Sequence, residues 1–225
     1  SSHALSQYRV WGIAYDLAVI TNLTREHLDY HHTFQEYQAA KYWLFENLTK
    51  FVRKPKIPKI AILNHDDRSF QEFSQAKTDR TFSYGILRGD ITASPSSYHE
   101  EGSEFLVETP IGKQRIKINL PGRFNIYNPL AAISAGMALG VKLKKTAAAL
   151  KKVKGVPGRM EVIDDGQDFK VIVDYAHTPD GLNQVLETLK PTLKGRLIVV
   201  VGAEGRRSKT KRPLLGALCG RYADF

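Results

Sequence analysis

Short apolar runs that end in a polar residue alternate along this chain with segments of helical periodicity, and this alternation restricts the possible folds. The runs 17–21 (LAVIT) and 60–64 (IAILN) have the length and composition of buried strands. A second series follows a Gly-Val-Pro-Gly segment and consists of two strands and two helices, expected at 169–174, 196–202, 181–189 and 213–222. Strands that alternate with helices build a parallel sheet, so we predict an α/β protein.

The segment between residues 82 and 120 has a different pattern. Stretches such as FLVETP and QRIKINL alternate apolar with polar residues between Gly, Pro and Ser, which predicts a small antiparallel meander. Helices are expected at 128–140 and 144–152. The Gly-Val-Pro-Gly segment is the best linker candidate, so we expect one domain at 1–156 and a second, with two parallel strands, at 157–225.

Composition and charge exclude several classes of protein. No apolar run approaches the roughly 20 residues that span a bilayer, and the single cysteine, Cys219, excludes an internal disulfide and indicates a reducing compartment. The net charge of +10 permits nucleic-acid binding, but the basic patches at 142–154 and 206–212 lack interleaved aromatic residues. A polyanionic small molecule such as a nucleotide suits the same charge. We therefore expect neither a nucleic acid nor a membrane as partner.

Lys41 lies where a helix is expected to face the core. Thr33 and Glu36 form a T-x-x-E capping box, which predicts a helix over 33–51. At about 100° per residue, one stripe of this helix is apolar. The stripe contains Phe34, Tyr37, Ala40, Leu44, Phe45 and Leu48. Lys41 falls near its centre, whereas Lys50 falls on the opposite face. A lysine in that position either extends its ammonium group to water or has a partner and a chemical task.

Polar side chains with ligand chemistry follow the first expected strand: His27, Asp29, His31 and His32. Open α/β sheets bind their ligands beyond the carboxyl ends of the strands, so this turn and Lys41 form a candidate site. The alternative is a polar turn with ordinary surface histidines. Zinc is less favoured, because the H-x-x-x-H spacing precedes the helix rather than lying on it.

Two motifs in the second half could contact a nucleotide. In VDYAHTPDG, Asp174 could accept hydrogen bonds from ribose hydroxyls and His177 could stack on a base, unless the aspartate or threonine simply caps the next helix. In GAEGRRSKTKRP, glycines followed by basic residues suit an anion. The chain contains no Walker A motif, which requires G-x-x-x-x-G-K-[ST].

Two further motifs, LPGRFNIYNPLAA and GVPGRMEVI, contain Asn125, Asn128 and Arg159. Their amide and guanidinium groups could contact a base or a phosphate. Each residue taken singly is also typical of a cap, a turn or a surface charge.

In this order, the motifs resemble the Mur ligase family over essentially the whole chain. They are SSHALSQYR, TNLTREHLDYH with Lys41, GRFNIYNPLAA, PGRMEVI, VDYAHTPD and the G-x-x-G…KRP segment. The first two are specific to the UDP-N-acetylmuramoyl-tripeptide synthetase branch, whereas NxLAA and DYAH are shared with other branches. The resemblance implies most of a central ATPase-type domain at 1–156 and the first half of a Rossmann-like C-terminal domain at 157–225.

The resemblance also implies an activity. A ligase of this branch uses ATP to add L-lysine or meso-diaminopimelate to UDP-MurNAc-L-Ala-D-Glu, in cytoplasmic peptidoglycan precursor synthesis. The substrate carboxylate becomes an acyl phosphate, the amine attacks it and phosphate leaves, while two Mg²⁺ ions neutralise charge. A monomer is expected. The alternatives are another amide ligase of the superfamily, of the cyanophycin or folylpolyglutamate type, and a non-catalytic nucleotide-binding module.

The same resemblance indicates a fragment. The chain begins SSHALSQYR, within an apparent element, and the P-loop of the family has no match in it. We expect the N-terminal UDP-binding domain and the end of the C-terminal domain to be missing as well. The polypeptide alone is therefore predicted to have no ligase activity.

Functional residues of the family transfer onto matching positions. Lys41 matches a catalytic lysine that CO₂ carbamylates, and His27 matches a magnesium ligand. Carbamylation needs a neutral amine, which a core position favours because it lowers the lysine pKa from about 10.4. The positions matched to UDP-sugar contacts are Ser1, Gln7 and Arg9, those matched to ATP contacts are Asn128, Arg159, Asp174, His177 and Lys209, and Arg207 matches an amino-acid contact. Arg206 and Ser208 replace acidic residues that often flank that arginine.

Overall fold

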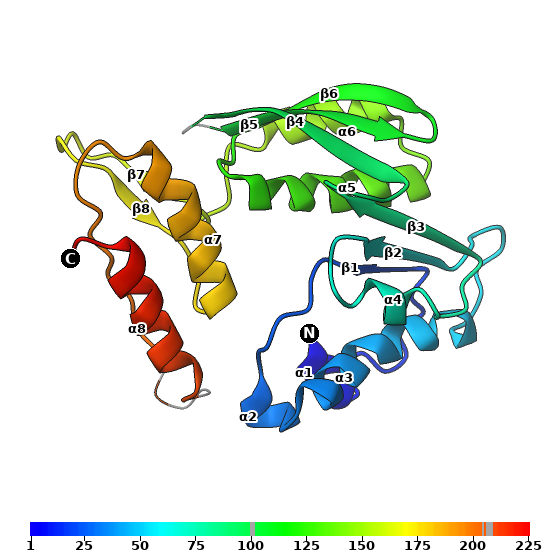
Figure 1. Ribbon diagram of the computed structural model, residues 1–225. Helices are drawn as coiled ribbons and strands as arrows, with labels where there is room; N and C mark the ends of the chain where they lie inside the picture. The colour runs from blue at the N-terminus through cyan, green and yellow to red at the C-terminus, as the bar shows by residue number, and fades with distance from the viewer. Residues whose placement is uncertain (100–101, 204, 206–208) are drawn as a thin grey trace.

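The computed structural model describes residues 1–99, 102–203, 205 and 209–225, and Figure 1 shows their arrangement. The N-terminal part is built on one six-stranded sheet with the strands in sequence order. The strands are β1 (Leu17–Ile20), β2 (Ile60–Asn64), β3 (Arg80–Gly85), β4 (Ile91–His99), β5 (Gly102–Thr109) and β6 (Gly112–Ile118). With the helices described below, this confirms the predicted α/β class.

Parallel and antiparallel pairing divide this sheet. Strands β1 to β4 pair in parallel, and β4, β5 and β6 form the antiparallel meander. The meander was predicted to begin at residue 82, but it begins at Ile91. Phe82 belongs to β3, where it pairs in parallel with Ile62. The next residues, Ser83 to Gly85, are all buried, which is typical of an interior parallel strand.

Helices cover both faces of the sheet (Figure 1). On one face Ile60 and Ile62 of β2 pack with Leu130 and Ile133 of α5. On the other face Leu63 packs in a second cluster, with residues of α3 and α4. The helices of this part are α1 (Ser2–Ser6), α2 (Leu28–His31), α3 (Phe34–Glu46), α4 (Phe70–Phe73), α5 (Tyr127–Ala138) and α6 (Leu143–Lys152), with short 3₁₀ turns η1 (Leu48–Lys50) and η2 (Arg123–Ile126).

Helix α3 begins as predicted and ends earlier than predicted. The hydroxyl of Thr33 accepts a hydrogen bond from the Glu36 backbone amide at 3.1 Å, which is the N-cap contact. The helix was predicted to continue to residue 51. It stops at Glu46, where the side-chain amide of the C-cap residue Asn47 donates to the Trp43 carbonyl at 2.8 Å, and the 3₁₀ turn η1 follows.

The C-terminal part differs more from the prediction. Strands β7 (Glu161–Ile163) and β8 (Val171–Val173) form an antiparallel pair, followed by α7 (Pro179–Leu189), η3 (Lys190–Thr192) and α8 (Lys211–Tyr222). The strand predicted at 196–202 is wrong, and so is the parallel sheet predicted for this part, because no described strand pairs with that segment. Leu197 and Val199 instead bond to Asp224 and Phe225. The apolar pattern is that of a strand, but a strand exists only where a second one completes its ladder.

A third core cluster holds this part together. Leu182 and Leu186 of α7 pack with Leu197 and with Leu215 of α8. Thr178 caps α7 by accepting from the Gly181 amide at 3.1 Å. Across the described residues, no helix is both long enough and apolar enough to cross a membrane.

Candidate active site

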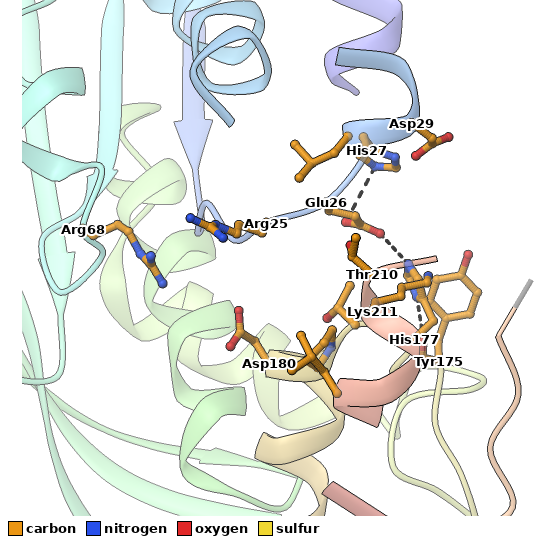
Figure 2. A pocket seen from close by; sticks show the side chains of 14 residues that line it. Arg25, Glu26, His27, Asp29, Arg68, Tyr175, His177, Asp180, Thr210 and Lys211 are labelled. Atoms are coloured by element: carbon orange, nitrogen blue, oxygen red, sulfur yellow. Dashed lines mark hydrogen bonds and ion pairs between the residues drawn. The ribbon is translucent and has the colours of Figure 1, made fainter. Parts of the chain in front are cut away.

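A cavity of about 660 Å³ lies between the loop that follows β1 and the first turns of α7 and α8 (Figure 2). Two contacts fix that loop at the carboxyl end of the sheet. The side-chain amide of Asn64, the last residue of β2, donates to the Thr21 carbonyl at 2.7 Å. The carboxylate of Asp67 accepts from the Leu23 amide at 3.1 Å. The cavity is lined by Arg25, Glu26, His27, Leu28, Asp29, Arg68, Tyr175, His177, Thr178, Pro179, Asp180, Thr210, Lys211 and Leu214.

His27 lies at the cavity wall in an unusual backbone conformation. Its φ angle of 58° is left-handed, and His32 at the other end of α2 has a φ of 59°. Two such residues bracket a helix of four residues, so the chain turns tightly on both sides of it. The His27 ring lies 4.7 Å from the His3 ring and 5.9 Å from the Tyr37 ring, measured between centroids. The predicted turn is therefore a packed and strained feature rather than an open surface loop.

Glu26 connects the two walls of the cavity. One of its carboxylate oxygens lies 2.5 Å from His177 Nε2, and the other lies 3.6 Å from His27 Nε2. The second ring nitrogen of His177, Nδ1, lies 3.0 Å from the Tyr175 carbonyl. Glu26 was not predicted from the sequence. Its position directly before His27 was the only signal, and that signal does not reveal a partner so far along the chain.

Lys41 is half-buried on α3, behind this wall. Its ammonium nitrogen lies 5.2 Å from the centroid of the Tyr37 ring. Burial lowers the pKa of Lys41, and the negative charge of Glu26 opposes that shift. Burial also raises the pKa of Tyr37 to about 12. The predicted core-facing lysine is thus present, in surroundings that favour the neutral amine more than water does.

Family models decide the relationship. The model of the Mur ligase middle domain matches residues 1–136, and the model of the Mur ligase glutamate ligase domain matches residues 158–225.

The chain belongs to the Mur ligase family.

Among curated proteins, it is 45% identical over 225 residues to a UDP-N-acetylmuramoyl-L-alanyl-D-glutamate–2,6-diaminopimelate ligase of Bacillus velezensis, covering 100% of this chain and 46% of that protein. A solved structure of a ligase of the same name matches with a TM-score of 0.72 and 33% identity, covering 99% of this chain and 45% of that one. A MurF ligase from Thermotoga maritima, solved with ADP, shares the fold at a TM-score of 0.72 and 21% identity, covering 92% and 46% of the two chains. The chain thus spans about half the length of the curated relatives it matches.

The residues predicted to contact the UDP-sugar flank α1, which packs against α3. Ser1 caps α1 by accepting from the Ala4 amide at 3.2 Å, Gln7 ends this helix, and Arg9 is exposed in the following turns. None of these three residues lines the cavity described above. Next to Ser1, the buried hydroxyl of Ser2 has no hydrogen-bond partner among the described residues, and the same holds for Nε2 of the buried His31.

The residues predicted to contact the nucleotide form two groups. The Arg159 guanidinium lies 4.8 Å from the Tyr175 ring centroid, and the Asp174 carboxylate accepts from the Met160 and Ala176 amides at 2.8 Å each. Asp174 therefore joins the start of its own turn to residue 160, while the cap of α7 that the alternative interpretation assigned to an aspartate or a threonine comes from Thr178. Asn128 lies in the first turn of α5, where its side-chain amide donates to Asn125 at 3.2 Å.

Two basic residues assigned from the Mur ligase resemblance precede α8 in the sequence. Lys209 is exposed just before that helix, next to the cavity-lining residues Thr210 and Lys211. Arg207, the predicted amino-acid contact, lies outside the described residues, as do its neighbours Arg206 and Ser208. Arg25, Arg68 and Lys211 were not predicted from the sequence, although all three line the cavity, together with the carboxylates of Glu26, Asp29 and Asp180.

Proposed function

We propose that the protein containing this chain is an ATP-dependent amide ligase that acts on UDP-MurNAc-L-Ala-D-Glu. ATP phosphorylates the free carboxylate of this substrate and leaves as ADP, the amine of the incoming amino acid attacks the acyl phosphate, and inorganic phosphate leaves. The observation that carries the proposal is that His27 and His177 line one cavity, with Lys41 beside Tyr37 on the neighbouring helix α3, in a chain that belongs to the Mur ligases. We expect this reaction in the cytoplasm and the protein to be a monomer.

The incoming amino acid is 2,6-diaminopimelate in this proposal, with L-lysine as the alternative. The support is the name of the relatives, which are 2,6-diaminopimelate ligases. A folylpolyglutamate-type ligase has weaker support, because the likeness to such an enzyme is 20% in sequence and concerns the fold alone.

Mg²⁺ is the metal that this proposal places at the cavity, as a partner of ATP. Among the described residues, no three His, Cys, Asp or Glu side chains form a group that could hold a metal alone. Mg²⁺ normally takes several of its ligands from phosphates and water, so the protein needs to supply only a few. His27 and a carbamate on Lys41 would be those protein ligands. A bound Mg²⁺ would neutralise phosphate charge.

The chain's own residues would bind and orient the substrates. Arg25, Arg68 and Lys211 are the cationic side chains of the lining that would contact phosphate groups. We assign the nucleotide to Asn128, Arg159, Asp174, His177 and Lys209, the UDP-sugar to Ser1, Gln7 and Arg9, and the amino-acid carboxylate to Arg207. The boundary between the two domains is proposed after residue 156, and the separate family matches at 1–136 and 158–225 support it.

Phosphate release by the full-length protein tests the proposal. Release should require ATP, UDP-MurNAc-L-Ala-D-Glu and diaminopimelate together, and a folate substrate should not replace the nucleotide sugar. The 225-residue chain should release none, because it contains no Walker A motif. ATP binding by the full-length protein without any turnover would favour the nucleotide-binding module instead.

A further inference from the structure

We propose that Glu26 is a positioning residue that holds the cavity closed through its ion pair with His177. This inference rests on the proposed function, because the closed cavity is the one that would hold ATP. Glu26 belongs to the loop after β1, and His177 belongs to the turn between β8 and α7, 151 residues later (Figure 2). The pair therefore joins the two parts of the chain directly at the cavity.

The contacts of His177 make this pair stronger than an ordinary surface contact. Nδ1 faces the Tyr175 carbonyl, which can only accept, and Nε2 faces the Glu26 carboxylate. Nε2 lies 2.5 Å from the carboxylate oxygen, and a hydrogen bond to an ionised acceptor is stronger than one between neutral groups. The two side chains are 36% and 24% exposed, so water screens the pair only in part.

A second contact between the two parts lies away from the cavity. Gly122, just before η2, has a φ of +91°, and a Cβ built on it would lie 2.9 Å from the Thr188 side chain of α7. Gly122 and Thr188 therefore lie close together, away from the cavity. The Glu26 pair acts at the cavity itself, between the loop after β1 and the turn before α7. Loss of the pair should therefore let the cavity end of the C-terminal part move away from that loop.

Glu26 also reaches the catalytic candidates. Its second oxygen faces His27, and its charge acts on Lys41 and Tyr37. The Glu26 carboxylate therefore contacts both His27 on its own loop and His177 on the C-terminal part. When this contact is made, the C-terminal part lies next to the residues that would face the reacting phosphate.

The test uses the full-length protein with a fluorophore pair placed at Lys50 and Lys194, two exposed positions on the two parts. In Glu26→Gln, which keeps His177, we expect the closed fraction to fall about tenfold, since a charge-assisted hydrogen bond is replaced by a neutral one. The KM for ATP should rise by a similar factor with little change in kcat, because only the closed fraction binds productively. Glu46→Gln, the control, removes an exposed carboxylate of the N-terminal part. It should change neither the closed fraction nor the KM for ATP.

Two more variants separate the pair from a general loss of structure. The double variant Glu26→Gln with His177→Gln should be no more open than either single variant, and exchange of the two residues, E26H with H177E, should restore closure. An unchanged closed fraction in Glu26→Gln, or losses that multiply in the double variant, would overturn the inference. Distances are measured without turnover, so a wild type that closes but releases no phosphate would refute the proposed function and leave the role of Glu26 intact.

Discussion

Replacement of the buried Lys59 by methionine should destabilise the sheet strongly. The Lys59 side chain is fully buried, and its ammonium donates to the Tyr15 carbonyl at 2.6 Å, the Val52 carbonyl at 3.0 Å and Asp16 Oδ1 at 3.0 Å. Methionine fills most of the volume and removes all three donors. Removal of one partner from a buried ion pair costs about 3–5 kcal/mol. Asp16 keeps its contact with Lys54, so we expect a loss at the lower end, about 3–4 kcal/mol.

Lys54→Met is the matched control, because Lys54 contacts the same Asp16 carboxylate with a side chain that is 50% exposed. Exposed pairs contribute about 0–1 kcal/mol, so this variant should lose less than about 1 kcal/mol. Urea unfolding followed by circular dichroism measures the free energy of unfolding of each variant. An unchanged dependence of that free energy on urea concentration shows that each variant exposes the same surface on unfolding as the wild type. Equal losses in the two variants, or a Lys59→Met protein as stable as the wild type, would refute the reasoning that burial makes the Lys59 contacts costly to break.

Three further predictions concern a cap, a carboxylate and the central lysine. Thr33→Ala should lower the free energy of unfolding by about 1 kcal/mol, measured in the same urea assay, because the Glu36 amide loses its acceptor. The pKa of Asp79 is held at about 2, chiefly by the hydrogen bond from Arg53, so its carboxylate stabilises the fold above its ordinary pKa of 3.8, and this stabilisation is lost as the pH falls towards 2. The free energy of unfolding of Asp79→Asn, measured as the pH is lowered, should lack this part of the pH dependence, and an unchanged pH dependence would contradict the prediction. The intact mass of the full-length protein prepared in bicarbonate should show an extra carboxyl group. Lys41→Ala should lose both this group and turnover, whereas Lys50→Ala should keep both. An unmodified Lys41 whose removal leaves turnover unchanged would show that this lysine is only a structural residue.

Periodicity within a single element predicted the central elements of the fold. The strand at 60–64 was found at these bounds as β2, since five consecutive buried residues leave little alternative. The helix start at Thr33 followed from local capping chemistry. The pairing between elements was harder to predict from the sequence. Phe82 was assigned to the antiparallel meander because its neighbours alternate, but its strand pairs in parallel with β2. The segment 196–202 has a strand's composition without a described partner.

The candidate site shows the same division between local and long-range information. His27 and Lys41 were predictable, because a strand end and a helix stripe are patterns of neighbouring residues. Glu26 stands one position before His27, and nothing in its own neighbourhood distinguishes it from an ordinary surface carboxylate. Its significance comes from His177, 151 residues away, and His177 in turn was selected only as a possible stacking partner for a base. The packing of the C-terminal part beside the N-terminal part brings the loop after β1 and the turn after β8 to one cavity, and that packing is a property of the folded chain. A residue whose task is to join two loops is therefore the kind of functional residue that a single sequence conceals most effectively.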